Sequence, residues 1–225
     1  MRPVEGGRMP AHEASVQVQA GSVTLEGDLS VPEGARGIVV FAHGSGSSRL
    51  SPRNRRVAAM LRQAGLATLL FDLLTPTEEA VDSVTRELRF DIRLLADRVE
   101  AATAWLKEQP GVGDLNLGYF GASTGAAAAL VAAAERPEDV AAVVSRGGRP
   151  DLAEPYLPRV QAPTLLIVGE WDEPVIEMNR QAMAHLGGTK ELVIVPGASH
   201  LFEELGRLEE VARLASAWFS RHLIR

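Results

Sequence analysis

The chain has 225 residues, 46% of them hydrophobic and 23% charged, which is typical of a soluble globular domain that buries a full core. It contains no cysteine, and this excludes disulfides, thiolate catalysis and cysteine-ligated zinc. The formal net charge of −6 at pH 7 argues against a nucleic-acid partner, because such proteins are usually basic.

The N-terminal segment and the longest apolar run bear on where the protein acts. Residues 1–13 have no apolar core, so we expect a flexible leader rather than a secretory signal. The longest uninterrupted apolar run, Ala126–Ala134, is far shorter than the ~20 residues that span a bilayer. We therefore expect a cytoplasmic protein with no membrane partner.

A local cluster of arginines indicates the solvated face of a surface helix rather than a nucleic-acid site: Arg49, Arg53, Arg55 and Arg56.

The first predicted elements are strands followed by a well-marked helix. Apolar residues alternate over 16–18 and again over 23–31, which predicts an antiparallel hairpin. The nearly continuous β-branched run GIVVFAH (37–43) predicts a strand that is covered on both faces. A helix then follows, with Ser51 as its cap, a proline in its first turn and Gly65 at its end.

Strands and helices alternate over the rest of the chain. Residues 67–72 predict a second buried strand, and apolar residues from Leu88 to Leu106 have the spacing of a long helix that Pro110 stops. Such alternation implies a parallel sheet with helices on both faces and an active site at the carboxyl ends of its strands. The further predicted strands cover 115–120, 140–145, 164–169 and 191–195, and the further helices cover 123–136, 175–186 and 205–222.

A serine stands between two glycines in the stretch Gly121-Ala122-Ser123-Thr124-Gly125, after a predicted strand and at the start of a predicted helix. A tight turn that lifts a side chain above the sheet leaves no room for Cβ atoms, which explains both glycines. The helix N-terminus behind Ser123 favours negative charge that develops near it. We predict that Ser123 is a nucleophile, although an Ala/Gly-rich helix start also produces this pattern.

A serine nucleophile needs a base and an acid that orients the base. His200 lies in the loop between the last strand and the last helix, and we predict that it is the base. Asp172 closely follows the strand 164–169, from where its carboxylate can reach the imidazole nitrogen facing away from the serine. Glu170 and Glu173 remain alternatives, because a small error in the strand end would exchange them with Asp172.

An oxyanion hole uses backbone N–H groups, and two are expected here. Thr124, the residue after the serine, supplies one of them. The other comes from the loop HGSG (43–46), where we assign it to Ser45 with Gly46 as the alternative. We interpret His43 as a structural residue whose ring pins this loop, rather than as a second base.

Together these motifs resemble those of the α/β-hydrolase superfamily over nearly the whole chain after the leader. The residues that carry the resemblance are HGSG (43–46), GASTG (121–125), Asp172 in GEWDEPV and His200 in GASHLF, in the serine–acid–histidine order of that fold. The compact size is most similar to the dienelactone-hydrolase-like branch. The resemblance implies one domain over residues 14–225, with an eight-stranded, mostly parallel sheet whose second strand is antiparallel. It also implies cleavage of an ester or a related acyl bond.

Two features depart from that branch. The dienelactone hydrolases proper use a cysteine nucleophile, so a dienelactone is not the expected substrate of this cysteine-free chain. Only residues 146–162 stand where many relatives insert a helical cap, which predicts an open site without a cap domain. We expect Arg146 and Gly46 to contact the substrate, Arg146 through a carboxylate. An ion pair of Arg146 with Asp72 or Asp151 is the alternative.

These observations predict a serine hydrolase that cleaves carboxylic esters of small or medium substrates through an acyl-enzyme intermediate, without a cofactor. No metal site is expected, because the histidines are scattered and no ligand spacing occurs. A thioesterase or acyltransferase with the same triad, and a non-catalytic binding protein on this fold, remain alternatives. The expected partner is a small-molecule ester, and the sequence leaves a homodimer as an open hypothesis.

Overall fold

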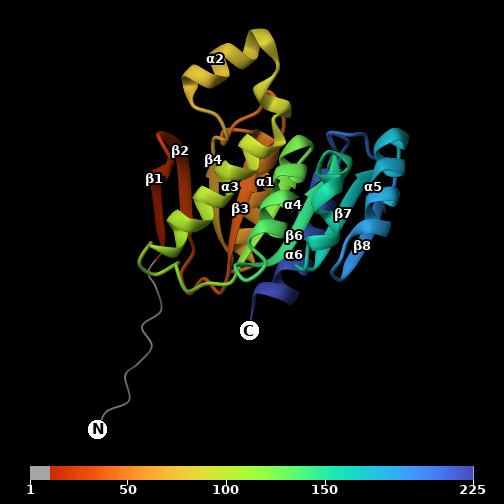
Figure 1. The fold of residues 1–225 in the computed structure, drawn as a ribbon. Helices are drawn as coiled ribbons and strands as arrows, with labels where there is room; N and C mark the ends of the chain where they lie inside the picture. Colours follow the sequence, from red (N-terminus) through yellow and green to blue (C-terminus); the bar gives the residue numbers. More distant parts are fainter. Residues whose placement is uncertain (1–10, 225) are drawn as a thin grey trace.

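The computed structural model describes residues 11–224, in which eight strands form a sheet with helices on both faces (Figure 1). The strand order is β1-β2-β4-β3-β5-β6-β7-β8. The second strand pairs antiparallel with both of its neighbours, and the remaining pairs are parallel, as expected. The strands are β1 (His12–Ala20), β2 (Val23–Val31), β3 (Ile38–Ala42), β4 (Ala67–Phe71), β5 (Leu117–Ala122), β6 (Val140–Arg146), β7 (Thr164–Gly169) and β8 (Lys190–Val195).

The first strand corrects the expected start of the domain. β1 begins at His12, which pairs with Val31 of β2, so His12 and Glu13 belong to the sheet and not to a leader. Backbone pairing along the hairpin extends the strand although its first side chains are polar and exposed. The rest of the expected leader falls on residues 1–10, which lie outside the described residues.

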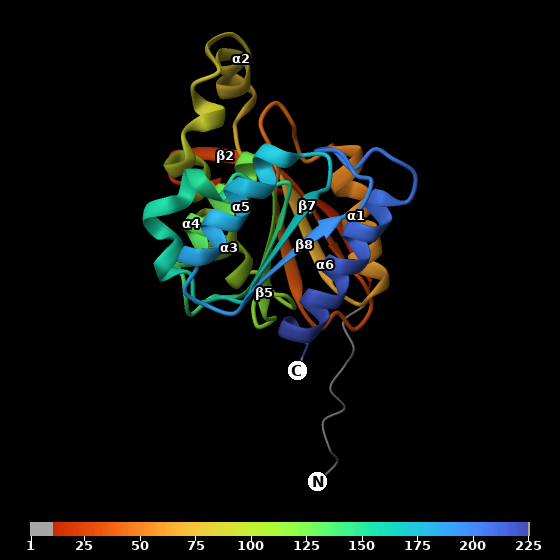
Figure 2. The same cartoon turned by 90° about the vertical axis from the view of Figure 1, so that its right-hand side faces the viewer.

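Helices cover the sheet in two layers. Two of them, α1 and α6, pack together on one face, and α3, α4 and α5 lie on the other (Figure 2). Among residues 11–224, no helix is both long and apolar enough to cross a membrane. The helices on the two faces are α1 (Pro52–Gln63), α3 (Ile92–Lys107), α4 (Thr124–Glu135), α5 (Glu173–His185) and α6 (Arg207–Leu223).

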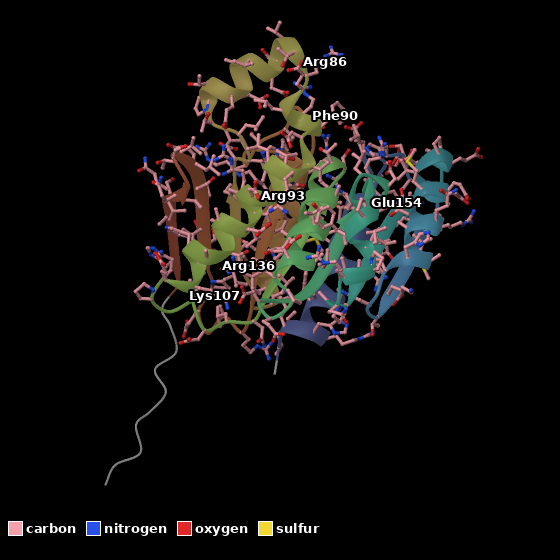
Figure 3. All side chains as sticks on the ribbon, viewed as in Figure 1. Arg86, Phe90, Arg93, Lys107, Arg136 and Glu154 are labelled. Atoms are coloured by element: carbon pink, nitrogen blue, oxygen red, sulfur yellow. The ribbon has the colours of Figure 1, made fainter. Side chains whose placement is uncertain are left out.

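The helix expected from Leu88 begins later than predicted, because the chain forms three elements between β4 and β5. They are α2 (Pro76–Thr85), the 3₁₀ turn η1 (Leu88–Phe90) and α3. A capping box joins Thr75 to Glu78 at the start of α2, and the sequence pattern Thr-x-x-Glu was its signal. α2 extends beyond the carboxyl edge of the sheet (Figure 1), with the exposed Phe90 at its base (Figure 3).

The connection from β6 to β7 contains only the 3₁₀ segment η2 (Pro150–Arg159). Accordingly, the described residues include no cap domain at this point, as the length of 146–162 predicts. The carboxyl ends of β3, β5, β6 and β7 are therefore free to form a site.

Candidate active site

Ser123 lies in a strained turn between β5 and α4. Its backbone angles are φ 52° and ψ −121°, in a region that residues with a Cβ atom rarely adopt. A Cβ atom at Gly121 would lie 2.4 Å from Ala126 Cα, and one at Gly125 would lie 2.2 Å from the Ala42 carbonyl oxygen. Both glycines are therefore required by the close approach of backbone segments, as the sequence pattern predicts.

Neighbouring backbone groups hold the turn in place. The Ser123 N–H donates to the Arg146 carbonyl at 3.2 Å, at the end of β6. The Ser123 carbonyl accepts from the N–H groups of Ala126 and Arg149, each at 3.1 Å. Because both backbone groups of Ser123 are satisfied, the turn keeps its unusual angles and the side chain stands at the carboxyl edge of the sheet.

The imidazole of His200 is held by Asp172. The two side chains meet at 2.5 Å, between Nδ1 and Oδ2, and the Asp172 side chain is only 14% exposed. Asp172 is the N-cap residue of α5, yet its side chain makes no capping hydrogen bond. The Asp172 carboxylate therefore accepts a hydrogen bond from the imidazole Nδ1–H. This keeps the proton on Nδ1 and leaves Nε2 with a free lone pair.

The two alternative acids have other places. Glu170 accepts a hydrogen bond from the Gly197 N–H at 2.7 Å, and Glu173 is the first residue of α5. Glu204 accepts from the Ser199 N–H at 3.0 Å. Glu170 and Glu204 thus fix the backbone of the loop that carries the histidine, whereas Asp172 is the carboxylate that meets its ring.

Ser123 and His200 line the same pocket, which has a volume of about 250 Å³. Within residues 11–224 no hydrogen bond joins the Ser123 hydroxyl to the imidazole, although the sequence predicts hydrogen-bond reach. Such bonds are often long in unliganded sites and tighten when substrate binds. The arrangement therefore has the elements of a nucleophile and a base around one cavity.

The expected oxyanion donors lie side by side: Ser45 lines the pocket of Ser123, and Thr124 lines an adjoining pocket that Ser45 also lines. The Ser45 and Thr124 hydroxyls are hydrogen-bonded at 2.9 Å, which joins the loop after β3 to the start of α4. Among the described residues, neither backbone N–H donates a hydrogen bond, and Thr124 has no helical acceptor because it is the first residue of α4. Gly46, the alternative donor, has φ 63° and lines two neighbouring pockets rather than that of Ser123.

His43 holds the loop 43–46 in place. Its Nδ1 donates to the Gly44 carbonyl and its Nε2 accepts from the Leu73 N–H, each at 3.0 Å, so the ring is neutral with its proton on Nδ1. Burial lowers the pKa of His43 and stabilises that neutral form. Both ring nitrogens are occupied, which leaves none for a second base, as the sequence analysis expects.

Arg146 also lines the pocket of Ser123, but the alternative of an ion pair with Asp72 or Asp151 is wrong. Asp72 pairs with Arg49, and Asp151 pairs with Arg149 at 2.7 Å. Both carboxylates are therefore engaged by other arginines, and the buried side chain of Arg146 lines the cavity. Arg53, which lines this pocket from the first turn of α1, is not among the predicted site residues, and its place beside the cap of the helix is the signal that could identify it.

The model of the dienelactone hydrolase family matches residues 25–222. The chain belongs to that family. The matched range contains every candidate site residue, and the family and its fold are those of hydrolases. The crystal structure of a dienelactone hydrolase from Anabaena variabilis has a TM-score of 0.93 and 64% identity, and the match covers 95% of this chain and 99% of that one.

Two further comparisons concern a longer relative and a structure that shares the fold. A protein of Mycobacterium tuberculosis described as a putative phosphoribosyl transferase is 60% identical over 214 residues, which are 95% of this chain and 47% of that protein. The chain thus spans about half the length of that relative. Est1E from Butyrivibrio proteoclasticus has a TM-score of 0.78 and 15% identity, with 92% of this chain and 98% of that one covered, so it shares the fold.

Proposed function

We propose that the chain is a serine hydrolase that cleaves carboxylic esters of small or medium substrates through an acyl-enzyme intermediate. The observation that carries the proposal is the strained Ser123 turn in one pocket with His200, whose ring Asp172 holds at 2.5 Å. Membership of a hydrolase family supports the same reaction class.

In the acylation step, the Ser123 oxygen attacks the ester carbonyl carbon and its proton passes to Nε2 of His200. Asp172 stabilises the imidazolium that forms, through the bond to Nδ1. The backbone N–H groups of Ser45 and Thr124 hold the oxyanion, and each donor of this kind is worth about 3 kcal/mol. The tetrahedral intermediate then collapses, the carbon–oxygen bond to the alcohol breaks, and the alcohol leaves with the proton from Nε2.

In the deacylation step, water takes the place of the alcohol. His200 removes a proton from the water as it attacks the acyl carbon, and the same proton returns to Ser123 when the acyl–oxygen bond breaks. The products are a carboxylic acid and the free enzyme. Arg146 faces this pocket and binds a negatively charged substituent of the substrate.

Labelling with a fluorophosphonate probe, followed by peptide mapping, tests the proposal. We expect a single adduct on Ser123 and hydrolysis of p-nitrophenyl esters, both absent in Ser123→Ala. A folded protein that takes no adduct would contradict the proposal and favour a non-catalytic binding protein on this fold.

A matched pair of variants tests the role of the acid. Asp172→Asn keeps the shape of the side chain but removes the charge that orients the imidazole, and kcat/KM should fall by about 10³–10⁴. Glu170→Gln makes the same change at a carboxylate that bonds the Gly197 N–H, and should lower kcat/KM less than about tenfold. Equal losses in the two variants would contradict the assignment of Asp172.

A further inference from the structure

Arg146 is a buried charge without a counter-ion among the described residues, and its guanidinium lies 6.0 Å from the centre of the Phe202 ring. Two arginines in the described part of the chain are buried, Arg98 at 8% exposure and Arg146 at 7%. Arg98 pairs with Glu78 at 2.8 Å, whereas within residues 11–224 the Arg146 guanidinium makes no ion pair or hydrogen bond and its Nε is unpartnered. A buried charge without a counter-ion is costly, so its retention at a cavity indicates that a ligand supplies the opposite charge.

The charge of Arg146 persists at neutral pH and is joined by that of Arg53. Burial, and then the nearby charge of Arg53, lower the pKa of Arg146 to about 10, so the guanidinium stays protonated. Arg53 reaches an exposed carboxylate, Glu203, through one terminal nitrogen at 3.0 Å, and its buried Nε has no partner. The two cations therefore repel each other across the pocket unless an anion lies between them.

The N-terminus of α1 adds a third source of positive potential. The first turn of this helix has no acidic residue, although carboxylates are favoured there, and it carries arginines instead. The Ser51 oxygen accepts from the Asn54 N–H at 3.3 Å, so its hydroxyl proton is free to donate. Ser51, Asn54, Arg53 and Arg146 all line the pocket, and no aspartate or glutamate of the described residues is among those that line it.

These charges exceed what a single carboxylate would balance. Arg146 contributes a full charge, Arg53 a charge that an exposed partner offsets only in part, and the helix terminus about half a charge. A phosphate monoester carries about −1.5 to −2 at neutral pH and three acceptor oxygens, which suits two guanidinium groups and neutral hydroxyl donors. Helix N-termini are common phosphate sites for the same reason.

We propose that this pocket binds a phosphate group carried by the substrate, between Arg146, Arg53 and the N-terminus of α1. The inference deepens the proposed ester hydrolysis and rests on it, because the phosphate would hold the substrate while its ester group reaches Ser123.

Binding of inorganic phosphate tests the site without catalysis. Calorimetry at constant ionic strength should detect phosphate binding to the wild-type protein, and Arg146→Gln or Arg53→Gln should weaken it by about 10- to 100-fold. Arg55→Gln is the matched control, because it removes the same charge from the same helix turn at an exposed residue outside the pocket. Arg55→Gln should change the affinity less than twofold. No phosphate binding, or equal losses in Arg53→Gln and Arg55→Gln, would overturn the inference.

Three p-nitrophenyl esters of equal chain length then test the substrate class: those of butyric acid, succinic acid and 3-phosphonopropionic acid. We expect the highest kcat/KM for the phosphonate ester, and loss of that preference in Arg53→Gln. Preference for the succinate ester would overturn phosphate in favour of carboxylate, and preference for the butyrate ester would overturn an anionic substrate altogether.

Different results refute the hydrolase proposal and the phosphate proposal. A protein that labels at Ser123 but binds no phosphate refutes only the inference, and one that binds phosphate but does not label refutes the hydrolase.

Discussion

Replacing Ser123 with glycine should stabilise the protein while abolishing catalysis. Ser123 holds φ 52° and ψ −121°, a conformation that costs a residue with a Cβ atom about 1–3 kcal/mol and costs glycine little. Glycine loses more backbone entropy on folding, which offsets about 0.5–1 kcal/mol of the gain. The Ser123 hydroxyl makes no hydrogen bond within the described residues, so its removal forfeits none. The net gain should therefore lie between about 0 and 2.5 kcal/mol, with a middle value of about 1 kcal/mol.

Ser123→Ala is the control that separates strain from chemistry. It removes the same hydroxyl but keeps the Cβ atom, so its free energy of unfolding should stay within about 0.5 kcal/mol of the wild type. Urea unfolding, followed by circular dichroism, measures all three proteins, and for a chain of this size Ser123→Gly should also melt a few degrees higher. If Ser123→Gly were no more stable than Ser123→Ala, the argument that the turn stores backbone strain would be refuted.

Three further perturbations have defined outcomes. Burial lowers the pKa of His43, so the unfolded chain binds a proton that the native state does not; the free energy of unfolding should fall below about pH 6.5, by at most ~1.4 kcal/mol per pH unit, and fall less in His43→Asn. Asp82 is fully buried and accepts from the backbone and side chain of Arg89, so Asp82→Asn should speed proteolysis of the α2 segment several-fold. Gly125→Ala places a Cβ atom 2.2 Å from the Ala42 oxygen and should destabilise the protein by about 3 kcal/mol or more in urea unfolding.

Each of these three has an outcome that contradicts it. An equal loss of stability between about pH 7.5 and 5.5 in His43→Asn and the wild type would exclude His43 as the titrating group. Asp97→Asn changes an exposed ion pair of α3 and should leave proteolysis of α2 unchanged, so equal rates of proteolysis in Asp97→Asn and Asp82→Asn would contradict the role of Asp82. Gly206→Ala meets no atom within 4 Å and should cost only the strain of its positive φ, so a loss as large as that of Gly125→Ala would refute the steric argument.

Local sequence patterns correctly predict most of the fold. The continuous apolar run of β3 is buried throughout, and the spacing of glycines around Ser123 predicted the turn that the structure contains. Apolar spacing alone predicts one helix from Leu88, which is wrong because that spacing does not report the caps that divide the segment between β4 and α3. The Thr75–Glu78 capping box starts a separate short helix there, and Asp91 caps α3 by accepting from the Leu94 N–H.

The choice of partners among charged residues could not be predicted from the sequence. Asp72 and Asp151 both follow strand ends at the same edge of the sheet as Arg146, but Asp72 pairs with Arg49 and Asp151 with Arg149. Side-chain pairing depends on which atoms the packed loops bring within about 4 Å, and sequence separation does not report this distance. For the same reason the arginine cluster predicts Arg53 on a solvated helix face, whereas the structure places it in the lining of the Ser123 pocket.

The departures from local rules gather around one cavity. Ser123 and Phe202 are two of the three non-glycine residues with positive φ in the described part of the chain, and Phe202 packs its ring 6.0 Å from the Arg146 guanidinium. In the described part of the chain Arg146 is a buried charge without a counter-ion, and Arg53 places a cation at a helix N-terminus. Each of these features lowers stability, and packing elsewhere must offset it. The proposed ligand would account for both the backbone strain and the unbalanced charge at this pocket. Its reacting group would lie at Ser123 and its anionic group at Arg146.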